Sequence, residues 1–195
     1  MSIYFDFDDV ISNLYPCLKD LIQFIHGWNP PDSLNLYCFN EQEQFGGNLK
    51  HNIDEIPITD TDIHKLIAML MYGDVRSLPV CEDVRYYFDS CNLDDELKIV
   101  TARTCHLESI MKKWFSINLP EQMFKIYFCN GSINKAKILH DLKADYYVED
   151  QYKIANTIAD SGIKVFLVNK SYNQGLPEHD NIIRINKLRD IQKYY

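Results

Sequence analysis

Short segments that are apolar almost throughout recur along the chain, and they constrain its fold more than any other feature. A strand of this kind is buried on both faces, as in a parallel sheet that is covered by helices. We predict six strands, the last weaker than the others, at Ile3–Phe7, Leu97–Thr101, Lys125–Cys129, Asp145–Glu149, Ile163–Val168 and Ile182–Ile185. The chain is therefore expected to have an α/β fold.

Helical patterns lie between the later strands. Apolar residues recur at helical spacing in three groups: Leu107, Ile110, Met111 and Trp114; then Ile133, Ala136, Ile138, Leu139 and Leu142; then Ile154, Ala155 and Ile158. From about residue 95 onward the predicted order is β-α-β-α-β-α-β-β-α. This order is typical of a Rossmann-like, doubly wound parallel sheet with right-handed crossovers.

The segment after the first strand has a different character. Helical stretches near Leu14–His26 and Asp62–Tyr72 flank a middle that is rich in Pro, Asn and Gln. We expect residues 12–76 to form a small helical insertion, and residues 1–11 and 77–195 to form the α/β core.

The net charge and the apolar runs exclude some classes of protein. A net charge of −8 argues against an extended nucleic-acid-binding surface, because such binding needs Lys and Arg to neutralise phosphates. No stretch approaches the roughly 20 apolar residues of a membrane helix. Asp6, Asp8 and Asp9 stand where a signal peptide would need an apolar run. We therefore expect an intracellular, cytoplasmic protein with no membrane contact.

Acidic residues follow two of the predicted strands. Asp6, Asp8 and Asp9 come after the first strand, and the fourth strand ends in Glu149 and Asp150. Ligands of open α/β sheets bind beyond the carboxyl ends of the strands. Several like charges at one edge are costly unless a cation neutralises them, and oxygen ligands without His or Cys favour Mg²⁺. Asp6 and Asp150 are therefore candidate Mg²⁺ ligands.

Two further residues at this edge suit a phosphate. Thr101 closes the second strand and Lys135 precedes the fourth, so both could bind phosphate oxygens. Hydrolysis of a phosphate monoester is very slow in water and needs several catalytic devices. A carboxylate nucleophile divides the reaction into two steps through an aspartyl-phosphate, and a second carboxyl group two residues on can act as acid and then as base.

Four motifs, in this order, resemble those of the haloacid dehalogenase superfamily of phosphotransferases. They are a hydrophobic strand with DxDx(V/T), here "IYFDFDDV", a strand that ends in Thr or Ser, here "KIVTAR", a Lys ahead of the fourth strand, and an acidic pair, here "YYVED". The resemblance covers the core from residue 1 to about residue 170. It implies a small helical cap inserted after the first strand.

The resemblance implies a role for each matched residue. Asp6 matches the nucleophile, Asp8 the general acid and base, and Thr101 the phosphate-binding hydroxyl. Lys135 matches the lysine of the third motif, with Lys137 as the alternative.

The resemblance also implies Mg²⁺ as the cofactor. Its ligands would be Asp6, the backbone carbonyl of Asp8, and Asp150. Glu149 would be the partner of Asp150 and would act through water or through the lysine.

Contacts to the substrate phosphate are expected from Asp9, Thr101, Ala102, Arg103 and Lys135. Asp9 stands where many relatives have Gly, so it would change the charge preference for the substrate or be solvated. Arg103 would touch the substrate or its phosphate, or form a surface salt bridge, and both interpretations stay open.

The C-terminal third narrows the expected substrate. Its loop of the form K-x-Y-N, matched by Lys170, Tyr172 and Asn173, and the segment "IVTARTCHLESIMKKWF" resemble the 5'(3')-deoxyribonucleotidase branch and related nucleotidases. This implies a Mg²⁺-dependent 5'-nucleotidase that acts on (deoxy)nucleoside monophosphates. Aromatic side chains of the insertion would stack on the base or form its core: Tyr15, Phe24, Trp28, Tyr37, Phe39, Phe45 and Tyr72.

Other functions stay open at this stage. One is a phosphatase of another small phosphoester or of a nucleic-acid 3'-phosphate end, and another is a phosphotransferase that uses the same aspartyl-phosphate. A non-catalytic binding module of the same fold is a third. The expected partner is a small-molecule phosphomonoester, and a homodimer is left open.

Overall fold

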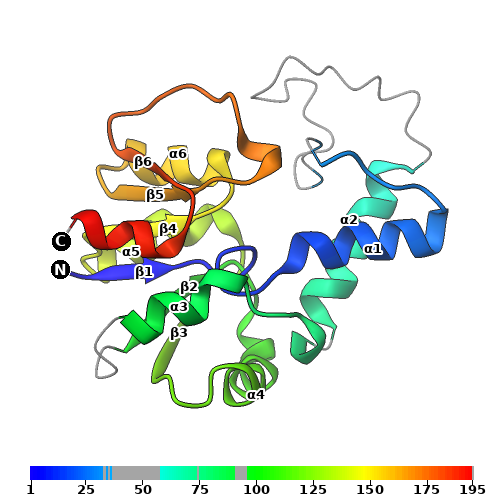
Figure 1. Ribbon diagram of the computed structural model, residues 1–195, viewed down its shortest axis with the longest axis horizontal. Coiled ribbons are helices and arrows are strands. Elements are labelled where there is room, and N and C mark those ends of the chain that lie inside the picture. Colours follow the sequence, from blue (N-terminus) through cyan, green and yellow to red (C-terminus); the bar gives the residue numbers. More distant parts are fainter. Residues whose placement is uncertain (33, 35, 37–57, 74, 91–95, 195) are drawn as a thin grey trace.

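Six parallel strands form one sheet in the computed structural model of the chain (Figure 1). The structure describes residues 1–32, 34, 36, 58–73, 75–90 and 96–194. The strands are ordered β3-β2-β1-β4-β5-β6, and every neighbouring pair is parallel. Their bounds are β1 Ile3–Phe5, β2 Leu97–Thr101, β3 Phe124–Phe128, β4 Tyr146–Glu149, β5 Lys164–Val168 and β6 Ile182–Ile185. The predicted Rossmann-like, doubly wound sheet is confirmed.

The first strand is shorter than predicted, because the chain turns back on itself after Asp6. Asp6 still donates its backbone N–H to the carbonyl of Val148 at 2.9 Å. The carbonyl of Phe7 then accepts the N–H groups of Ile11 and Ser12 at 3.0 and 2.8 Å. The acidic residues after β1 therefore lie in a tight turn at the carboxyl edge of the sheet.

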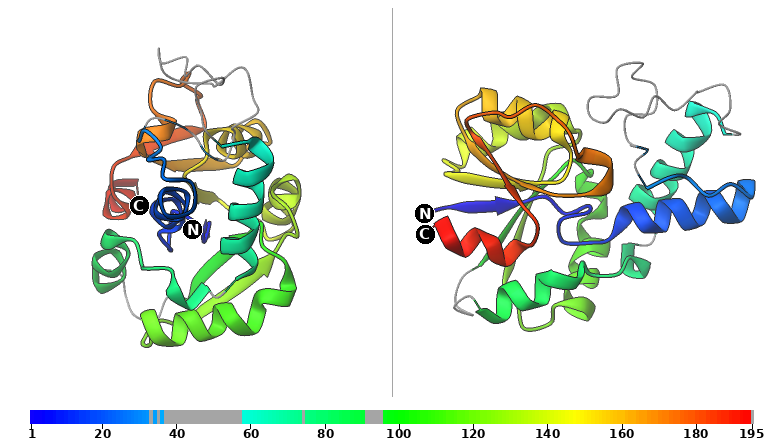
Figure 2. Two further views of the ribbon diagram at one scale, coloured as in Figure 1. Left: turned by 90° about the vertical axis from the view of Figure 1, so that its right-hand side faces the viewer. Right: turned by 45° about the horizontal axis from the view of Figure 1, so that its top comes forward.

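Helices cover both faces of the sheet (Figure 2). Because successive strand residues point to opposite faces, Tyr4 packs in one apolar cluster and Phe5 in another. The cluster of Tyr4 includes residues of α5 (Lys135–Asp141) and α6 (Tyr152–Asp160), and the cluster of Phe5 includes residues of α3 (Glu82–Ser90) and α4 (Glu108–Asn118).

Three parts of the core differ from the prediction. The sequence did not predict helix α3, because only Val84 and Tyr87 of this short helix are buried and two residues make a weak apolar periodicity. Ile133 is 88% exposed and lies in the 3-10 turn Ser132–Asn134 before α5, so it does not belong to the helical stripe. The last helix, Leu188–Tyr194, is a 3-10 helix. Among the described helices, none is both long and apolar enough to cross a membrane.

Two helices of the predicted insertion lie beyond one end of the sheet, on the right in Figure 1. α1 (Leu14–His26) and α2 (Asp60–Tyr72) share a third apolar cluster, which is separate from the two clusters on the sheet. α1 ends at Gly27, whose φ of +66° is the left-handed conformation that glycine adopts readily. Both helices match the expected segments, and the division of the chain at residues 12 and 76 stays a prediction.

The aromatic residues of this region do not share one environment. Tyr15 is buried in the third cluster and Trp28 packs against that cluster, as the core interpretation predicts. Phe24 and Tyr72 are 88% and 57% exposed, so they are not core residues. The remaining three, Tyr37, Phe39 and Phe45, lie outside the described residues.

Candidate active site

The centre of the sheet brings the two acidic segments together. Strands β2 and β3 lie on one side of β1, and β4, β5 and β6 lie on its other side. The direction in which the sheet grows therefore reverses between β1 and β4. Open α/β sheets bind their ligands in the crevice at such a point, beyond the carboxyl ends of the strands. Phe5 pairs with Val148, so Asp6 and Glu149 follow at neighbouring positions.

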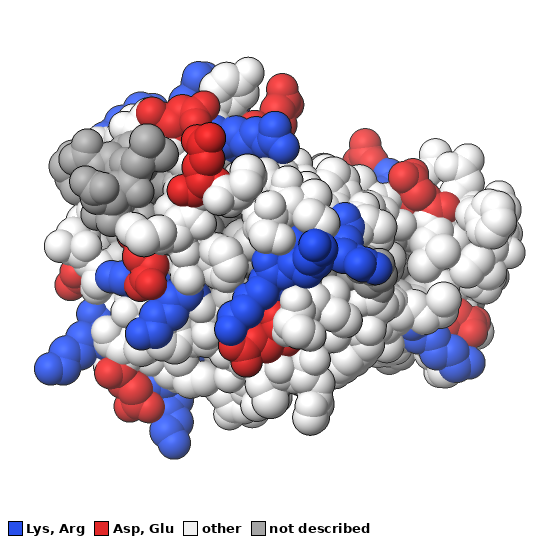
Figure 3. Space-filling model, turned by 90° about the horizontal axis from the view of Figure 1, so that it is seen from below, with Lys and Arg blue, Asp and Glu red and all other residues white. Residues whose placement is uncertain are grey.

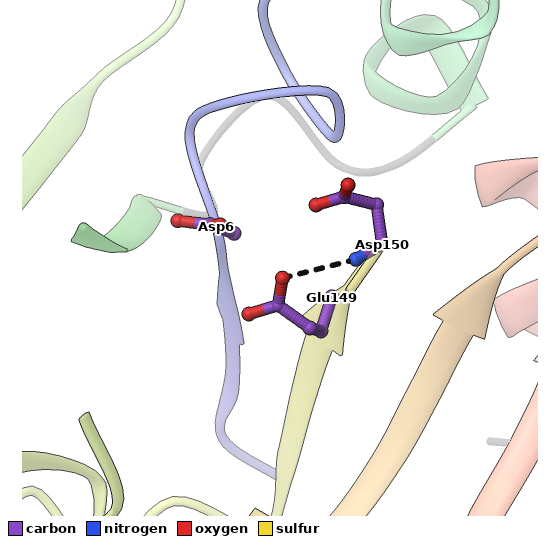
Figure 4. A group of neighbouring side chains, drawn as sticks. All are labelled: Asp6, Glu149 and Asp150. Atoms are coloured by element: carbon purple, nitrogen blue, oxygen red, sulfur yellow. Dashed lines mark hydrogen bonds between the residues drawn. The ribbon is translucent and has the colours of Figure 1, made fainter. Parts of the chain in front are cut away.

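Three buried carboxylates meet at this edge. Asp6, Glu149 and Asp150 each offer an oxygen, and these oxygens lie within 4.8 Å of one another. Figure 4 shows Asp6 at the tip of β1 and the other two side chains at the tip of β4. Glu149 is held by the N–H groups of Asp150 and Gln151, which donate to its Oε1 at 3.2 and 3.1 Å. Asp6 Oδ1 accepts the N–H of Phe7 at 2.8 Å.

Lys135 is the cation of this group. Its Nζ lies 2.8 Å from Asp6 Oδ2 and donates to Glu149 Oε2 at 2.9 Å. Burial by itself lowers the pKa of Lys135, but the two carboxylates more than reverse this effect, so its pKa lies above the ordinary value. Lys137, two residues further along α5, is exposed. The structure therefore places Lys135 at the site and leaves the alternative lysine outside it.

The acids outnumber the ammonium group within this cluster of described residues. Burial raises the pKa of Asp6, Glu149 and Asp150 each to about 7, because a carboxylate that loses its hydration is harder to ionise. Asp150 Oδ1 is buried and has no hydrogen-bond partner among the residues that the structure describes. A buried carboxylate oxygen without a partner is costly. The oxygen-only donor set and this bare oxygen fit a hard divalent cation such as Mg²⁺.

Asp8 and the buried Arg103 form an ion pair beside the carboxylates. Arg103 donates from Nη2 to Asp8 Oδ1 at 2.7 Å and from Nε to Oδ2 at 3.1 Å. Arg103 thus forms a salt bridge, which was one of the two interpretations of the sequence. The guanidinium group is fully buried, however, so the salt bridge does not lie on the surface as that interpretation expected. This forked pairing fixes the orientation of the Asp8 carboxylate.

Thr101 and Ala102 connect this pair to β2. Thr101 is fully buried at the end of the strand, and its Oγ1 accepts the backbone N–H of Arg103 at 3.2 Å. The carbonyl of Ala102 accepts the N–H of Gly131 at 2.8 Å. Both residues lie at the same edge of the sheet as Asp6, and their phosphate contacts stay predictions.

Asp9 has a structural bond that the sequence did not reveal. It is 1% exposed, so the solvated alternative is wrong. Its Oδ1 accepts the N–H of Tyr15 at 2.8 Å, in the first turn of α1. Asp9 thus ties the turn after β1 to the insertion, and its expected contact with phosphate stays a prediction.

Sequence reasoning missed the residues that hold Asp150. Tyr172 donates its hydroxyl to Asp150 Oδ2 at 2.6 Å, and Asn173 donates Nδ2 to the Asp150 carbonyl at 2.7 Å. Both belong to the K-x-Y-N loop, whose sequence pattern resembles that of nucleotidases and gives no sign of a contact with Asp150. The signal that could have located them is the position of this loop directly after β5, the strand next to β4.

Because protons and a metal ion compete for the same carboxylates, we expect Mg²⁺ to stabilise the protein more at high pH. The folded-state pKa values of about 7 lie above ordinary carboxyl values, so the stability of the metal-free protein falls as pH rises from about 4 to about 7. Mg²⁺ at about 100 times its dissociation constant adds about 2.7 kcal/mol. We expect Tm to rise by about 5–10 °C at about pH 8, and by much less at about pH 5.5.

Thermal unfolding in Mg²⁺ and in EDTA at both pH values measures this effect. Asp150→Asn should lose the rise in Tm, and Asp141→Asn should keep it, because Asp141 is exposed at the end of α5. Equal rises at both pH values would exclude Asp6 and Asp150 as the ligands.

Two curated proteins are similar to part of this chain. No family model matches the chain. A protein of Halalkalibacterium halodurans that is named as a candidate nucleotidase is 36% identical over 95 residues, which are 48% of this chain and 47% of that protein. A Bacillus subtilis protein of similar name is 31% identical over 109 residues, which are 55% of this chain and 54% of that protein. The matched segments thus span about half the length of these curated relatives.

The architecture is also found among solved structures. A haloacid dehalogenase-like protein of unknown function from Agrobacterium tumefaciens aligns over 98% of this chain and 96% of its own, with a TM-score of 0.58 and 15% sequence identity. At this level of identity the likeness concerns the fold alone. The chain therefore has the haloacid dehalogenase-like fold.

Proposed function

We propose that the protein is a Mg²⁺-dependent phosphomonoester hydrolase that acts through an aspartyl-phosphate on (deoxy)nucleoside monophosphates. The observation that carries this proposal is the position of Asp6. Its carboxylate lies at the point where the strand order reverses, with the ammonium group of Lys135 at 2.8 Å and the bare Oδ1 of Asp150 in the same cluster.

Asp6 is the proposed nucleophile. In the first step a carboxylate oxygen of Asp6 forms a bond to phosphorus, and the ester P–O bond breaks. The leaving oxygen takes a proton from Asp8. In the second step the oxygen of a water molecule attacks phosphorus and gives a proton to Asp8, and the bond between phosphorus and Asp6 breaks.

Arg103 constrains how Asp8 performs these transfers. The guanidinium group uses one lone pair on each oxygen of Asp8, so Asp8 keeps a free lone pair that can carry the proton while the pair stays intact. The pair holds Asp8 oriented between the two steps.

Lys135 and Thr101 are the proposed ligands of the transferred phosphoryl group. Lys135 fixes Asp6 Oδ2 and places a positive charge next to the attacked phosphorus. Asp6 and Asp150 would hold Mg²⁺, which when bound supplies positive charge against the phosphate oxygens.

A cavity beside the site supports a small-molecule substrate. It measures about 490 Å³ and is lined by Asp9, Tyr172, Lys170 and one side of α1. Pockets for small ligands are typically about 300–1,000 Å³. On the face seen in Figure 3, a short band of Lys and Arg crosses the middle and acidic side chains lie around it. The net charge of −8 for the whole chain argues against an extended nucleic-acid-binding surface. The names of the curated relatives favour a nucleotide.

Phosphate release from a panel of monophosphates tests the proposal. The panel contains nucleoside and deoxynucleoside 5'-monophosphates, 3'-monophosphates, sugar phosphates and a 3'-phosphorylated oligonucleotide, each with Mg²⁺ and with EDTA. We expect release that depends on Mg²⁺ and is confined to nucleotides. An added alcohol should not capture the phosphoryl group.

Other outcomes separate the alternatives. Release from sugar phosphates or from the oligonucleotide end would keep the hydrolase and reject the nucleotide. Transfer to the alcohol would indicate a phosphotransferase. Folded protein that releases nothing would favour a binding module.

A further inference from the structure

We infer that Tyr172 positions Asp150 for the cation. The Ser171–Asn173 turn places the Tyr172 hydroxyl group against the Asp150 carboxylate. This inference rests on the proposed function, because it concerns the same metal site. Asp150 belongs to the fourth motif, but Tyr172 lies outside all four motifs, so the motifs do not indicate the contact between them.

The two oxygens of Asp150 have different environments. Oδ2 accepts the Tyr172 hydroxyl at 2.6 Å, and both groups are buried. Oδ1 lacks a hydrogen-bond donor in the described part of the chain. The short bond to Tyr172 opposes rotation of the carboxylate group. The hydroxyl therefore fixes the plane of the carboxylate, and with it the direction in which the oxygen without a donor points.

The loop that carries Tyr172 is held on both sides. Asn173 donates Nδ2 to the carbonyls of Asp150 and Val168, at 2.7 and 2.8 Å. Arg184 of β6 donates Nη2 to the carbonyl of Asn173 at 2.8 Å. The main chain next to Tyr172 is thus fixed to the ends of β4, β5 and β6.

The ring of Tyr172 is held by the insertion. It is 4% exposed and belongs to the apolar cluster of α1 and α2. Its centroid lies 4.5 Å from that of Tyr15, whose backbone N–H is bonded to Asp9. The hydroxyl group cannot leave Asp150 without moving a packed ring out of this cluster. Tyr172 therefore joins the inserted helices to the acidic cluster.

Groups that hydrogen-bond to metal-ligating carboxylates orient them, and their loss typically lowers metal affinity by about 10–100-fold. Tyr172→Phe keeps the ring and removes only the hydroxyl. We expect this variant to bind Mg²⁺ about 10–100-fold more weakly than the wild-type chain. If the hydroxyl had a purely structural role, its removal would lower the stability of the protein and leave its Mg²⁺ affinity unchanged.

The test is Mg²⁺ titration of the EDTA-stripped full chain by calorimetry, followed by phosphate release as a function of Mg²⁺ concentration. Tyr4→Phe is the matched control, because Tyr4 is also 4% exposed and donates its hydroxyl to the Leu142 carbonyl, on the sheet face covered by α5 and α6. Unfolding of each metal-free variant separates lost stability from lost affinity. Asp150→Asn marks the loss of a ligand itself.

The outcomes distinguish this inference from the proposed function. Weaker Mg²⁺ binding in Tyr172→Phe and wild-type binding in Tyr4→Phe would support the role of Tyr172. If Tyr172→Phe bound Mg²⁺ as tightly as the wild type or more tightly, and Asp150→Asn did not bind Mg²⁺, the role of Tyr172 would be overturned. The assignment of the metal site would remain valid. No Mg²⁺ binding by the wild-type chain would overturn both.

Discussion

Asp6→Asn should lower the rate of phosphate release by at least about 10³-fold and leave the chain folded. The amide has nearly the same shape as the carboxylate, but it is a far weaker nucleophile toward phosphorus. Asp6 is buried and its pKa is raised to about 7 by the loss of hydration, so a neutral side chain removes a charge that is costly to bury. We therefore expect the metal-free variant to be about as stable as wild type at about pH 8, or more stable.

The measurement is steady-state phosphate release with the preferred substrate, together with thermal unfolding of the same preparation. Asp141→Asn is the matched control, since it makes the same change at an exposed position at the end of α5. Wild-type turnover by folded Asp6→Asn would refute the assignment of the nucleophile. A loss of turnover in both variants would indicate a cause other than the chemistry of Asp6.

The sheet could be predicted because its strands carry a strong local signal. β2 and β6 have the bounds that the sequence predicts, and in β2 an almost continuous apolar run marks a strand that is largely buried. Local turns escaped this signal. The exposed Ile133 continues a helical pattern by chance, and only its 3-10 turn shows that α5 starts at Lys135.

The acidic edge could also be predicted, because parallel strands deliver their carboxyl ends to one side. This rule brings Asp6 and Asp150 together without any knowledge of side-chain contacts. The sequence places Lys135 ahead of the fourth strand, and in the structure its ammonium group contacts Asp6 and Glu149 at the two strand tips.

The partners of these residues could not be predicted. Arg103 meets Asp8 from 95 positions away, and Tyr172 meets Asp150 from 22 positions away. Such pairs depend on the packing of several elements and leave no periodic pattern in the chain. The same holds for Asp9, which looks like another acid of the site and in fact bonds to the first turn of α1.

Lys135→Met should destabilise the metal-free protein by about 3–5 kcal/mol at about pH 8, because it leaves buried carboxylates without their cation. The methionine side chain replaces the length of the stem but not the charge. Asp6 Oδ2 and Glu149 Oε2 both lose their bond to the ammonium group. Phosphate release should fall by about 10²–10³-fold, because the variant lacks the preorganised positive charge next to the reacting phosphorus.

The loss of stability should depend on pH in a definite direction. Lys135 lowers the pKa of both Asp6 and Glu149 against the larger effect of burial, so its removal raises these pKa values further above about 7. A raised folded-state pKa means that the folded protein takes up protons that the unfolded chain does not hold above about pH 4. The variant should therefore recover stability as pH falls, and the deficit at about pH 5.5 should be well below that at about pH 8.

Urea unfolding in EDTA at both pH values gives the free energy of unfolding directly. Lys137→Met removes an exposed lysine from the same helix and should change it by less than about 0.5 kcal/mol. If Lys137→Met lowered stability and turnover and Lys135→Met did not, the lysine of the site would be Lys137. If the deficit of Lys135→Met were the same at both pH values, the loss would come from packing of the side chain, because only ionised carboxylates need the ammonium group.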